Sequence, residues 1–252
     1  MGWKELLSDE VYVTPAVAES KRFGFSVLNI QCGLKTDSPF DVVGKTLEEV
    51  DYQIAVVRYP AVFEDIGTKL SGLNIRQIYA DSTVYWASER VIKNPVPISS
   101  ELRIFEISIH QLSSVISVID SSFDNYRSHW HYNPRTRHLQ MAAAYAEWVT
   151  NAMKWPDTTC YLMTHGDVPA GMAMTQIGED FAEILLAGIA KNFQAKGLYQ
   201  QLLQYVATDL RHKEMDKFVI STQSGNTNVQ KAWARYGLLP ALSIQTVHIE
   251  RK

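Results

Sequence analysis

The chain has 252 residues, of which 46% are hydrophobic, so it can bury the core of one large domain or two small ones. Its 24 basic residues against 27 acidic ones give a formal charge of -3, and no stretch concentrates lysine and arginine, which argues against nucleic-acid binding. Cys32 and Cys160 lie far apart and match no metal or redox spacing, so we expect buried free thiols in a reducing compartment.

The start of the chain and its hydropathy predict neither export nor membrane insertion. The first ten residues lack the basic-then-apolar pattern of a secretory signal, and Leu6 is incompatible with a myristoylation motif. No apolar run approaches the roughly 20 residues that span a bilayer. We therefore expect a soluble cytoplasmic protein.

The first hundred residues show strand and helix patterns in alternation. The predicted elements are strand 22–30, strand 52–59, helix 61–73 and strand 74–87. The stretch between the first two strands has loop-like composition. Two prolines in polar surroundings mark 92–100 as a linker. We therefore predict a small α/β domain over residues 1–100 and a second domain over residues 101–252.

The second domain has a different order of elements. After Pro156, three strand patterns are joined by tight turns, which predicts an antiparallel meander. A polar and aromatic loop is expected over 123–136. The predicted regular elements are strand 101–110, helix 111–121, helix 138–153, strands 159–164, 169–177 and 182–190, helix 197–213, strand 217–222, helix 226–236 and strand 241–250.

The turn at Gly197 has the features of an anion-binding site, because it joins a buried strand to the start of a helix. A helix begins with about four N–H groups that lack an internal partner and with the positive end of its dipole. A phosphate placed there gains hydrogen bonds and charge compensation, and glycine lets it approach the backbone closely. The alternative is a glycine that merely ends the strand, as in many α/β proteins.

The residues of this turn resemble a motif of a known enzyme family. Gln194–Tyr199, with the sequence QAKGLY, resembles the QxxGxG/A pyrophosphate loop of the GNAT acyltransferases, which use acyl-coenzyme A. The order of elements over 101–252 is similar to that family as well. The resemblance implies an α/β (α+β) GNAT fold, with a mixed, mostly antiparallel splayed sheet, and acyl-CoA as co-substrate without a metal. Tyr199 departs from the motif, whose last residue is small.

A second segment resembles the same family. Asn226, Val229 and Trp233, followed by Tyr236–Leu238, have the spacing of its NxxAxxLYxxxGF helix and turn. Relatives are thought to use the motif tyrosine to protonate the departing coenzyme A thiolate. Trp233 stands there instead, and its indole N–H is not acidic near neutral pH. Another group, water or unassisted departure must replace the tyrosine. Tyr236 is a candidate acid, with simple packing as its alternative role.

The resemblance implies where the coenzyme binds. A backbone N–H near Leu186 to Gly188 would hold the oxyanion of a tetrahedral intermediate. The residues expected to bind the coenzyme are Leu186, Ala187, Gly188, Gln194, Ala195, Lys196, Gly197, Leu198, Tyr199, Asn226 and Trp233.

The aromatic segment 122–134 and the helix residues Tyr145–Trp148 resemble parts of the nucleotide-linked amino-sugar acyltransferases, such as those that acetylate dTDP-4-amino-4,6-dideoxygalactose. Aromatic rings suit a deoxysugar face, and amides suit its hydroxyls. The residues expected to bind this substrate are Tyr126, Trp130, Tyr132 and Asn133.

The acceptor amine must lose a proton before it attacks the thioester, and a histidine can accept that proton near neutral pH. His129 is the expected base and His131 the second choice, with loop packing as the alternative for each. Glu183 is another candidate base. The other five histidines, including His248, are expected at element edges or on solvent-facing helix positions, without a role.

The leading hypothesis is therefore an N-acyltransferase that moves an acyl group from acyl-CoA to the amine of a dTDP-linked amino-deoxysugar, for surface polysaccharide synthesis. Direct attack on the thioester is the expected route. Two alternatives stay open: an acyltransferase for another small primary amine, and a non-catalytic acyl-CoA sensor that lacks the tyrosine acid. The N-terminal domain is expected to wall the nucleotide pocket, to serve as packing support or to form a homodimer surface.

Overall fold

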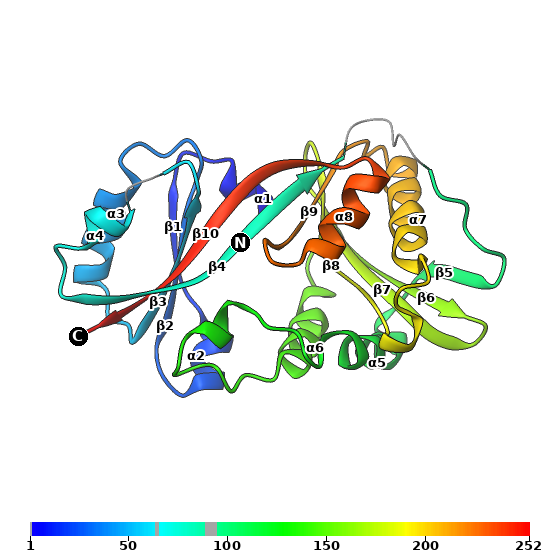
Figure 1. Cartoon of the computed structure of the whole chain (residues 1–252), viewed down its shortest axis with the longest axis horizontal. Coiled ribbons are helices and arrows are strands. Elements are labelled where there is room, and N and C mark those ends of the chain that lie inside the picture. Colours follow the sequence, from blue (N-terminus) through cyan, green and yellow to red (C-terminus); the bar gives the residue numbers. More distant parts are fainter. Residues whose placement is uncertain (1, 64–65, 89–94) are drawn as a thin grey trace. The chain divides into compact units, whose positions relative to one another are not determined.

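The computed structural model describes residues 2–63, 66–88 and 95–252 (Figure 1). Contacts group the chain into two compact units: unit 1 holds Met1–Val84, Ser128–His138 and Leu242–Lys252, and unit 2 holds Tyr85–Arg127 and Leu139–Ala241. Residues 92–94 of the expected linker lie outside the described residues. The expected consecutive domains, 1–100 and 101–252, stay a prediction about which parts of the chain fold alone.

Unit 1 is a mixed sheet with helices. Its strands follow the order β1-β2-β3-β10-β4; β1 is antiparallel to β2, β2 is parallel to β3, and β10 is antiparallel to β3. The strands are β1 (Val11–Pro15), β2 (Val27–Cys32), β3 (Ile54–Pro60), β4 (Ile75–Ala87) and β10 (Leu239–Arg251). The helices are α1 (Trp3–Leu6), α2 (Val17–Phe23), α3 (Pro39–Glu49) and α4 (Ile66–Leu70).

The structure confirms two of the predicted N-terminal strands and corrects the rest. Strand 52–59 corresponds to β3, and strand 74–87 corresponds to β4. Strand 22–30 is wrong at its start, because α2 continues to Phe23 and ends at Gly24 in a left-handed conformation with φ of 73°. The predicted loop after β2 contains α3, whose Val43 and Leu47 lie one turn apart and are buried. Residues 64–65 of predicted helix 61–73 lie outside the described residues, and its described part contains the single turn of α4.

One face of the unit 1 sheet forms an apolar core. Alternate residues of β2 and β3 point into it, as the two-residue period of a strand requires. Cys32 lies in this core as a buried free thiol, and burial raises its pKa to about 12. The core is built from Leu28, Ile30, Cys32, Val43, Leu47, Tyr52, Ala55, Val57, Tyr59, Ile66, Leu70, Val247 and Ile249.

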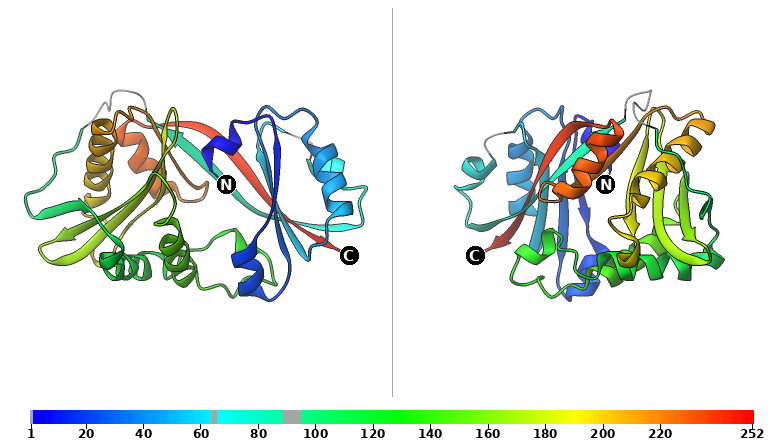
Figure 2. Two further views of the ribbon diagram at one scale, coloured as in Figure 1. Left: turned by 180° about the vertical axis from the view of Figure 1, so that it is seen from behind. Right: turned by 45° about the vertical axis from the view of Figure 1, so that its right-hand side comes forward.

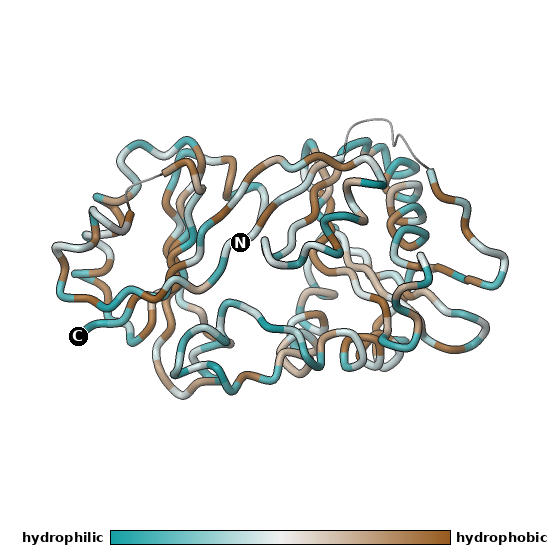
Figure 3. Tube along the Cα trace, viewed as in Figure 1, coloured by the Kyte–Doolittle hydropathy of each residue, from teal (hydrophilic) through white to brown (hydrophobic). Residues whose placement is uncertain are grey.

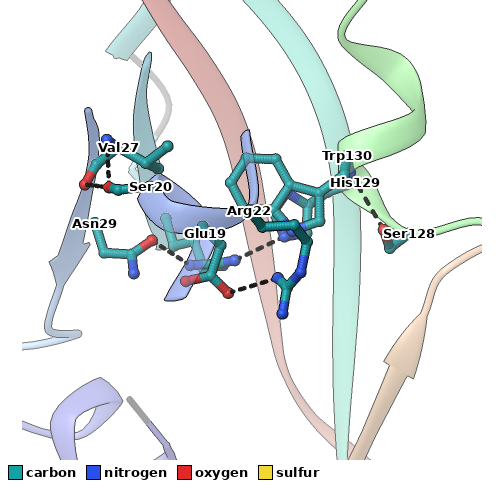
Figure 4. A network of polar contacts seen from close by, with 9 residues as sticks. Glu19, Ser20, Arg22, Val27, Asn29, Ser128, His129 and Trp130 are labelled. Atoms are coloured by element: carbon teal, nitrogen blue, oxygen red, sulfur yellow. Dashed lines mark hydrogen bonds and ion pairs between the residues drawn. The ribbon is translucent and has the colours of Figure 1, made fainter. Parts of the chain in front are cut away.

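The opposite face of this sheet carries a polar chain of side chains. Asn29 and His248 both pair with Val56 across the sheet, so they share a face, and Arg58 lies two residues further along β3 on that same face. The Arg58 guanidinium lies 3.5 Å from Asn29 Oδ1 and 3.0 Å from Nε2 of His129. Figure 4 shows Asn29 and His129 at the two ends of this chain of contacts.

The donors fix the tautomer of each ring. A guanidinium has no acceptor, so Nε2 of His129 must accept and Nδ1 carries the proton. That Nδ1–H donates to Nε2 of His248 over 2.8 Å. Neutral His248 then carries its proton on Nδ1, a buried atom without a hydrogen-bond partner among the described residues. Both histidines are therefore held neutral.

Burial lowers the pKa of His248 to about 3, and the positive charge of Arg58 adds to this effect. Burial and the same guanidinium also hold the pKa of the partly exposed His129 well below its usual range. His248 is fully buried inside β10, so its expected position at an element edge is wrong. Alternation along β10 places Val247 and Ile249 in the apolar core and His248 on the opposite face, where its burial depends on contacts with residues distant in sequence.

Unit 2 is a mostly antiparallel sheet in the order β9-β8-β7-β6-β5 with helices on both faces (Figure 2). The meander is confirmed, because β6 pairs antiparallel with β7 and β7 with β8. The strands are β5 (Leu102–Glu106), β6 (Thr158–His165), β7 (Val168–Ile177), β8 (Ala182–Ile189) and β9 (Phe218–Gln223). The helices are α5 (Leu112–Phe123), α6 (Met141–Ala152), α7 (Leu198–His212) and α8 (Thr227–Tyr236).

Two apolar clusters bury the two faces of this sheet. Alternation along β6 places Tyr161 and Met163 in one cluster, with α7 and α8, and Cys160 and Leu162 in the other, with α5 and α6. Figure 3 shows hydrophobic and hydrophilic residues alternating along α7, as expected of a helix with one buried face. The predicted helices and strands from 111 onward are confirmed within a few residues at their ends, whereas predicted strand 101–110 ends at Glu106 as β5 and is followed by a 3-10 helix over Ile109–Gln111.

The pairing of β10 with β3 predicts that residues 101–252 do not fold stably alone. Ile244 to Ile249 pair with Pro60 to Ala55, so removal of residues 1–100 would expose Val247 and Ile249 and leave the backbone of β10 unpaired. We expect this fragment to be insoluble, or to melt well below the full chain in circular dichroism. Co-expression with residues 1–100 should restore solubility, and a fragment that melts like the full chain would contradict the prediction.

The neutral histidine pair predicts acid sensitivity. The folded pKa of His248 is depressed, so below a pH of about 6.5 the unfolded chain binds a proton that the folded chain does not. The free energy of unfolding should therefore fall by about 1.4 kcal/mol per pH unit for this group as the pH drops from 6.5 towards 4. Urea unfolding across this range would measure the slope. His248→Gln should flatten it, whereas the exposed His212→Gln should not.

Candidate functional site

A cavity of about 830 Å³ lies in unit 2, where β8, α5, α7 and α8 come together. Two features of β8 open the sheet there. β8 and β9 pair in parallel only over Ala182–Ile184 and Phe218–Ile220, and β8 then continues to Ile189. The cavity is lined by Ser122, Phe123, Tyr126, Ala187, Gly188, Ile189, Phe193, Gln194, Ala195, Gly197, Leu198, Tyr199, Gln200, Asn226, Asn228, Val229, Lys231, Ala232 and Arg235.

The second feature of β8 is a bulge. Met174 pairs with Leu186 and the next residue of β7, Thr175, pairs with Ile184, so Leu185 is an extra residue without a partner across β7. A bulge bends its strand and interrupts the ladder of hydrogen bonds. It therefore precedes the stretch Ala187–Ile189 that forms the cavity wall.

The loop between β8 and α7 builds the next wall. Gly197 has φ of 75° and Ala195 has φ of 60°, and α7 begins at Leu198. Nothing lies within 4 Å of the position that a Cβ would take at Gly197. The side chain of Gln194 donates to the Ile189 carbonyl over 2.9 Å and ties the loop to the end of β8. The unpaired N–H groups at the start of α7 thus adjoin open space.

Glycine is also required at the α5 wall. A Cβ at Gly188 would lie 3.1 Å from the Phe123 ring and 3.3 Å from Cβ of Ser122, so the backbone of β8 approaches α5 closely. The hydroxyl oxygen of Ser122 is buried and has no hydrogen-bond partner in the described residues. Ser122 lines the cavity but was not predicted from the sequence, because a serine on an amphipathic helix carries no signal of its own.

The cavity brings together most of the residues predicted to bind the coenzyme. These are Ala187, Gly188, Gln194, Ala195, Gly197, Leu198, Tyr199 and Asn226. Leu186, Lys196 and Trp233 are not in its lining. Lys196 places its ammonium group 5.4 Å from the centre of the Phe193 ring, and Trp233 is 1% exposed. That these residues bind the coenzyme stays a prediction.

The sequence missed a basic pair on α8. Lys231 and Arg235 both line the cavity and are four residues apart, so they lie on one face of the helix. Their charges suit phosphate groups. The i, i+4 spacing was the signal that could have found them.

The two departures from the family motifs contact each other. The indole Nε1 of Trp233 donates to the hydroxyl oxygen of Tyr199 over 3.1 Å. Burial raises the pKa of Tyr199, and this hydrogen bond acts in the opposite direction. The tyrosine at the small-residue position and the tryptophan at the tyrosine position are therefore one structural unit.

The predicted acid Tyr236 is placed differently. Its side chain is 1% exposed and belongs to the apolar cluster on the α7 and α8 side of the sheet. Its hydroxyl donates to Oε1 of Gln204 over 3.2 Å, and burial raises its pKa. Tyr236 is not among the residues that line the cavity. Its role as an acid stays a prediction.

The predicted bases His129 and His131 belong to unit 1, whereas the cavity is lined by residues of unit 2. Both ring nitrogens of His129 are engaged, by Arg58 and His248. Nδ1 of His131 accepts from the backbone N–H of Ser128 over 3.1 Å and so helps to cap η2 (His129–Tyr132). The assignment of either histidine as base stays a prediction.

The predicted sugar-binding residues divide between the units. Tyr126 lines the cavity in unit 2. In unit 1, Trp130 is buried against Phe23 with ring centroids 5.1 Å apart, and the fully buried Asn133 donates to Glu250 over 3.0 Å. Tyr132 is about half exposed. Only Tyr126 and Tyr132 thus present surface to a ligand without rearrangement of a buried side chain.

Among the described residues, no group of three or more His, Cys, Asp and Glu side chains is arranged to hold a metal ion. Within the same ranges, no helix has both the length and the apolar character needed to cross a bilayer.

Comparisons with known proteins identify the family. The model of the acetyltransferase (GNAT) family matches residues 123–238. No curated protein sequence matches the chain. A functionally unknown conserved protein from Staphylococcus epidermidis shares the fold with a TM-score of 0.62, at 12% identity over 90% of this chain and 85% of that chain.

Two GNAT structures also share the fold. A GCN5-related N-acetyltransferase from Sphaerobacter thermophilus has a TM-score of 0.57, at 11% identity over 95% of this chain and 76% of its own. A GNAT acetyltransferase from Colwellia psychrerythraea has a TM-score of 0.54, at 13% identity over 84% of this chain and 71% of its own. Residues 123–238 thus match the acetyltransferase (GNAT) family, whose members are acyl-CoA-dependent N-acyltransferases, and the chain has the GNAT fold.

Proposed function

We propose that the chain transfers an acyl group from acyl-CoA to the amine of a dTDP-linked amino-deoxysugar, in the synthesis of a surface polysaccharide. The single observation that carries the proposal is the cavity that joins the opened end of β8 to the Gly197 turn and to α8. The choice of sugar rests on the resemblance of residues 122–134 and 145–148 to the amino-sugar enzymes. The comparisons support acyl transfer by the family and leave the acceptor to experiment.

The cavity suits the parts of acyl-CoA in order. The pantetheine arm would run beside Ala187–Ile189, where β8 has no partner from β9, and would take up its unpaired backbone groups. The diphosphate would lie at the Gly197 turn, against the first N–H groups of α7. Lys231 and Arg235 add positive charge on the α8 wall.

Acyl transfer then proceeds by direct attack of the amine on the thioester carbonyl. A backbone N–H near Leu186 to Gly188 would hold the oxyanion, and Ala187 and Gly188 line the cavity. The wall formed by Ser122 and Tyr126 offers hydroxyls to the acceptor. Binding both substrates in one cavity converts a bimolecular reaction into an intramolecular one.

A panel of acceptors tests the proposal. Purified protein is mixed with acetyl-CoA and with each of several dTDP-amino sugars, simple amino acids and aminoglycosides, and released coenzyme A is measured. Release with at least one dTDP-amino sugar at a higher kcat/KM than with any other amine is expected. If coenzyme A is released only with a simple amine, the acceptor is that amine and not a dTDP-amino sugar. Tight binding of coenzyme A with no turnover on any amine would favour a non-catalytic acyl-CoA sensor.

Gly197→Val is expected to weaken coenzyme A binding by at least about tenfold, since a branched side chain would enter the diphosphate space and strain a left-handed backbone. Calorimetry would measure the change. Gly24→Val is the matched control, because Gly24 has φ of 73° and equally open surroundings but lies in unit 1. Gly24→Val should lower the free energy of unfolding by a similar amount without weakening the binding of coenzyme A. Equal loss of binding in both variants would contradict the assignment.

His129 is tested as the proposed base by His129→Gln, which keeps a hydrogen-bonding side chain for Arg58 and His248. A base of this kind typically contributes about 100-fold or more, so kcat should fall at least tenfold with the melting temperature little changed. His248→Gln is the control for the polar chain, because it perturbs the same contacts without removing the proposed base. A kcat equal to wild type in His129→Gln would remove His129 from the mechanism.

A further inference from the structure

The contact between Tyr199 and Trp233 joins two helices at the wall of the cavity. Tyr199 lies in the first turn of α7 and lines the cavity, whereas Trp233 lies in the middle of α8 and is 1% exposed. The ring of Trp233 is fixed on another side by Trp86, with ring centroids 6.1 Å apart. The indole therefore holds a fixed position and presents its N–H to the tyrosine oxygen.

The hydroxyl proton of Tyr199 takes no part in this hydrogen bond. An indole N–H is a donor only, so the Tyr199 oxygen must be the acceptor. The hydroxyl keeps its own proton, and no acceptor for that proton is found among the described residues. Tyr199 lines the cavity, and its hydroxyl keeps a proton that no described side chain accepts.

The same hydrogen bond prepares the oxygen to lose its proton. An N–H donor aimed at a phenol oxygen stabilises the phenolate more than the phenol, because the hydrogen bond to a charged acceptor is stronger. Burial works against ionisation and keeps the group protonated at rest. Burial is the larger effect, so the phenol is protonated when the thiolate forms, and the Trp233 N–H offsets part of the cost of removing its proton.

We propose that Tyr199 is the general acid that protonates the coenzyme A thiolate, and that Trp233 positions it. The inference rests on the proposed acyl transfer. When the tetrahedral intermediate collapses, the C–S bond breaks and the electron pair stays on sulfur. The Tyr199 proton moves to that sulfur to give the free thiol, and the phenolate is held by the Trp233 N–H. Water then returns to the phenolate the proton that the attacking amine released.

The geometry favours Tyr199 over the other tyrosine acid. The hydroxyl of Tyr236 already donates to Gln204, and its side chain is outside the cavity lining. Tyr199 has neither limitation. Trp233 stands where the family motif has the tyrosine acid. In this chain it would orient the acid, Tyr199, through its indole N–H.

One experiment is independent of the acceptor. Calorimetry compares coenzyme A with desulfo-coenzyme A above the thiol pKa, where the sulfur is a thiolate. A hydrogen bond to a charged group predicts that wild type prefers coenzyme A by about tenfold. Tyr199→Phe should remove the preference, whereas Tyr205→Phe, on the same helix but outside the cavity lining, should keep it. Equal preference in Tyr199→Phe and wild type would overturn the proposal.

Turnover gives the second readout, with the best amine from the acceptor panel. Tyr199→Phe should lower kcat at least about tenfold with KM for acetyl-CoA within about threefold, because the acid acts after binding. Incorporation of 3-fluorotyrosine at position 199, a more acidic phenol, should shift the alkaline limb of the kcat profile to lower pH. A merely structural role of Tyr199 would leave that limb in place, and this outcome would overturn the proposal.

Trp233→Phe tests the positioning role. It removes the N–H but keeps an aromatic ring, so kcat should fall less than in Tyr199→Phe, and the double variant should be no slower than Tyr199→Phe alone. Additive losses would show that the residues act separately. If no amine supports turnover in wild type while the coenzyme A preference disappears in Tyr199→Phe, the proposed function fails and the contact between Tyr199 and sulfur stands.

Discussion

The site depends on the point at which β8 and β9 stop pairing. Parallel hydrogen bonds join only the first three residues of each strand, and beyond Ile184 the β8 backbone continues without β9. Unpaired backbone groups inside a protein are costly, so this opening requires a partner. In the proposed function, the extended arm of acyl-CoA, with its amide groups, would satisfy this requirement. The Gly197 turn and α8 then enclose the space that the separation of the strands creates.

Much of unit 2 was predictable from the sequence because its signals are local. Tight turns at 165–167 and 178–180 fixed the meander, and the helical period after Gly197 fixed α7. The N-terminal part was harder. Val43 and Leu47 of α3 are buried by β2 and β3, which are formed by distant residues, so tertiary packing outweighed the loop-like composition around them. α2 was taken for the start of a strand, because its apolar residues are few and none is buried.

The candidate site was predictable where a motif fixes the backbone and less so where side chains meet across the fold. The turn at Gly197, which lines the cavity, was predictable because the glycine and the helix start are adjacent in sequence. The partnership of Tyr199 with Trp233 was not, since 34 residues separate them and only the packing of α7 against α8 brings them together. His129 and His248 show the same limit, because their contact spans 119 residues and links the tautomers of the two rings. Single-residue chemistry suggested a base, and the structure shows two nitrogens already engaged.

The close approach at Gly188 limits how the cavity can vary. A Cβ there would lie 3.1 Å from the Phe123 ring, so the β8 main chain packs directly against that buried ring. A main chain packed on a buried ring has little room to move, so this part of the cavity wall varies little from one ligand to the next. Adaptation to larger acyl groups would therefore have to come from movable side chains elsewhere in the lining, such as Phe193 or Val229. The wall at Gly188 would then fix the part of the cavity that is the same for every acyl donor, whereas the movable side chains would fit the part of the donor that varies.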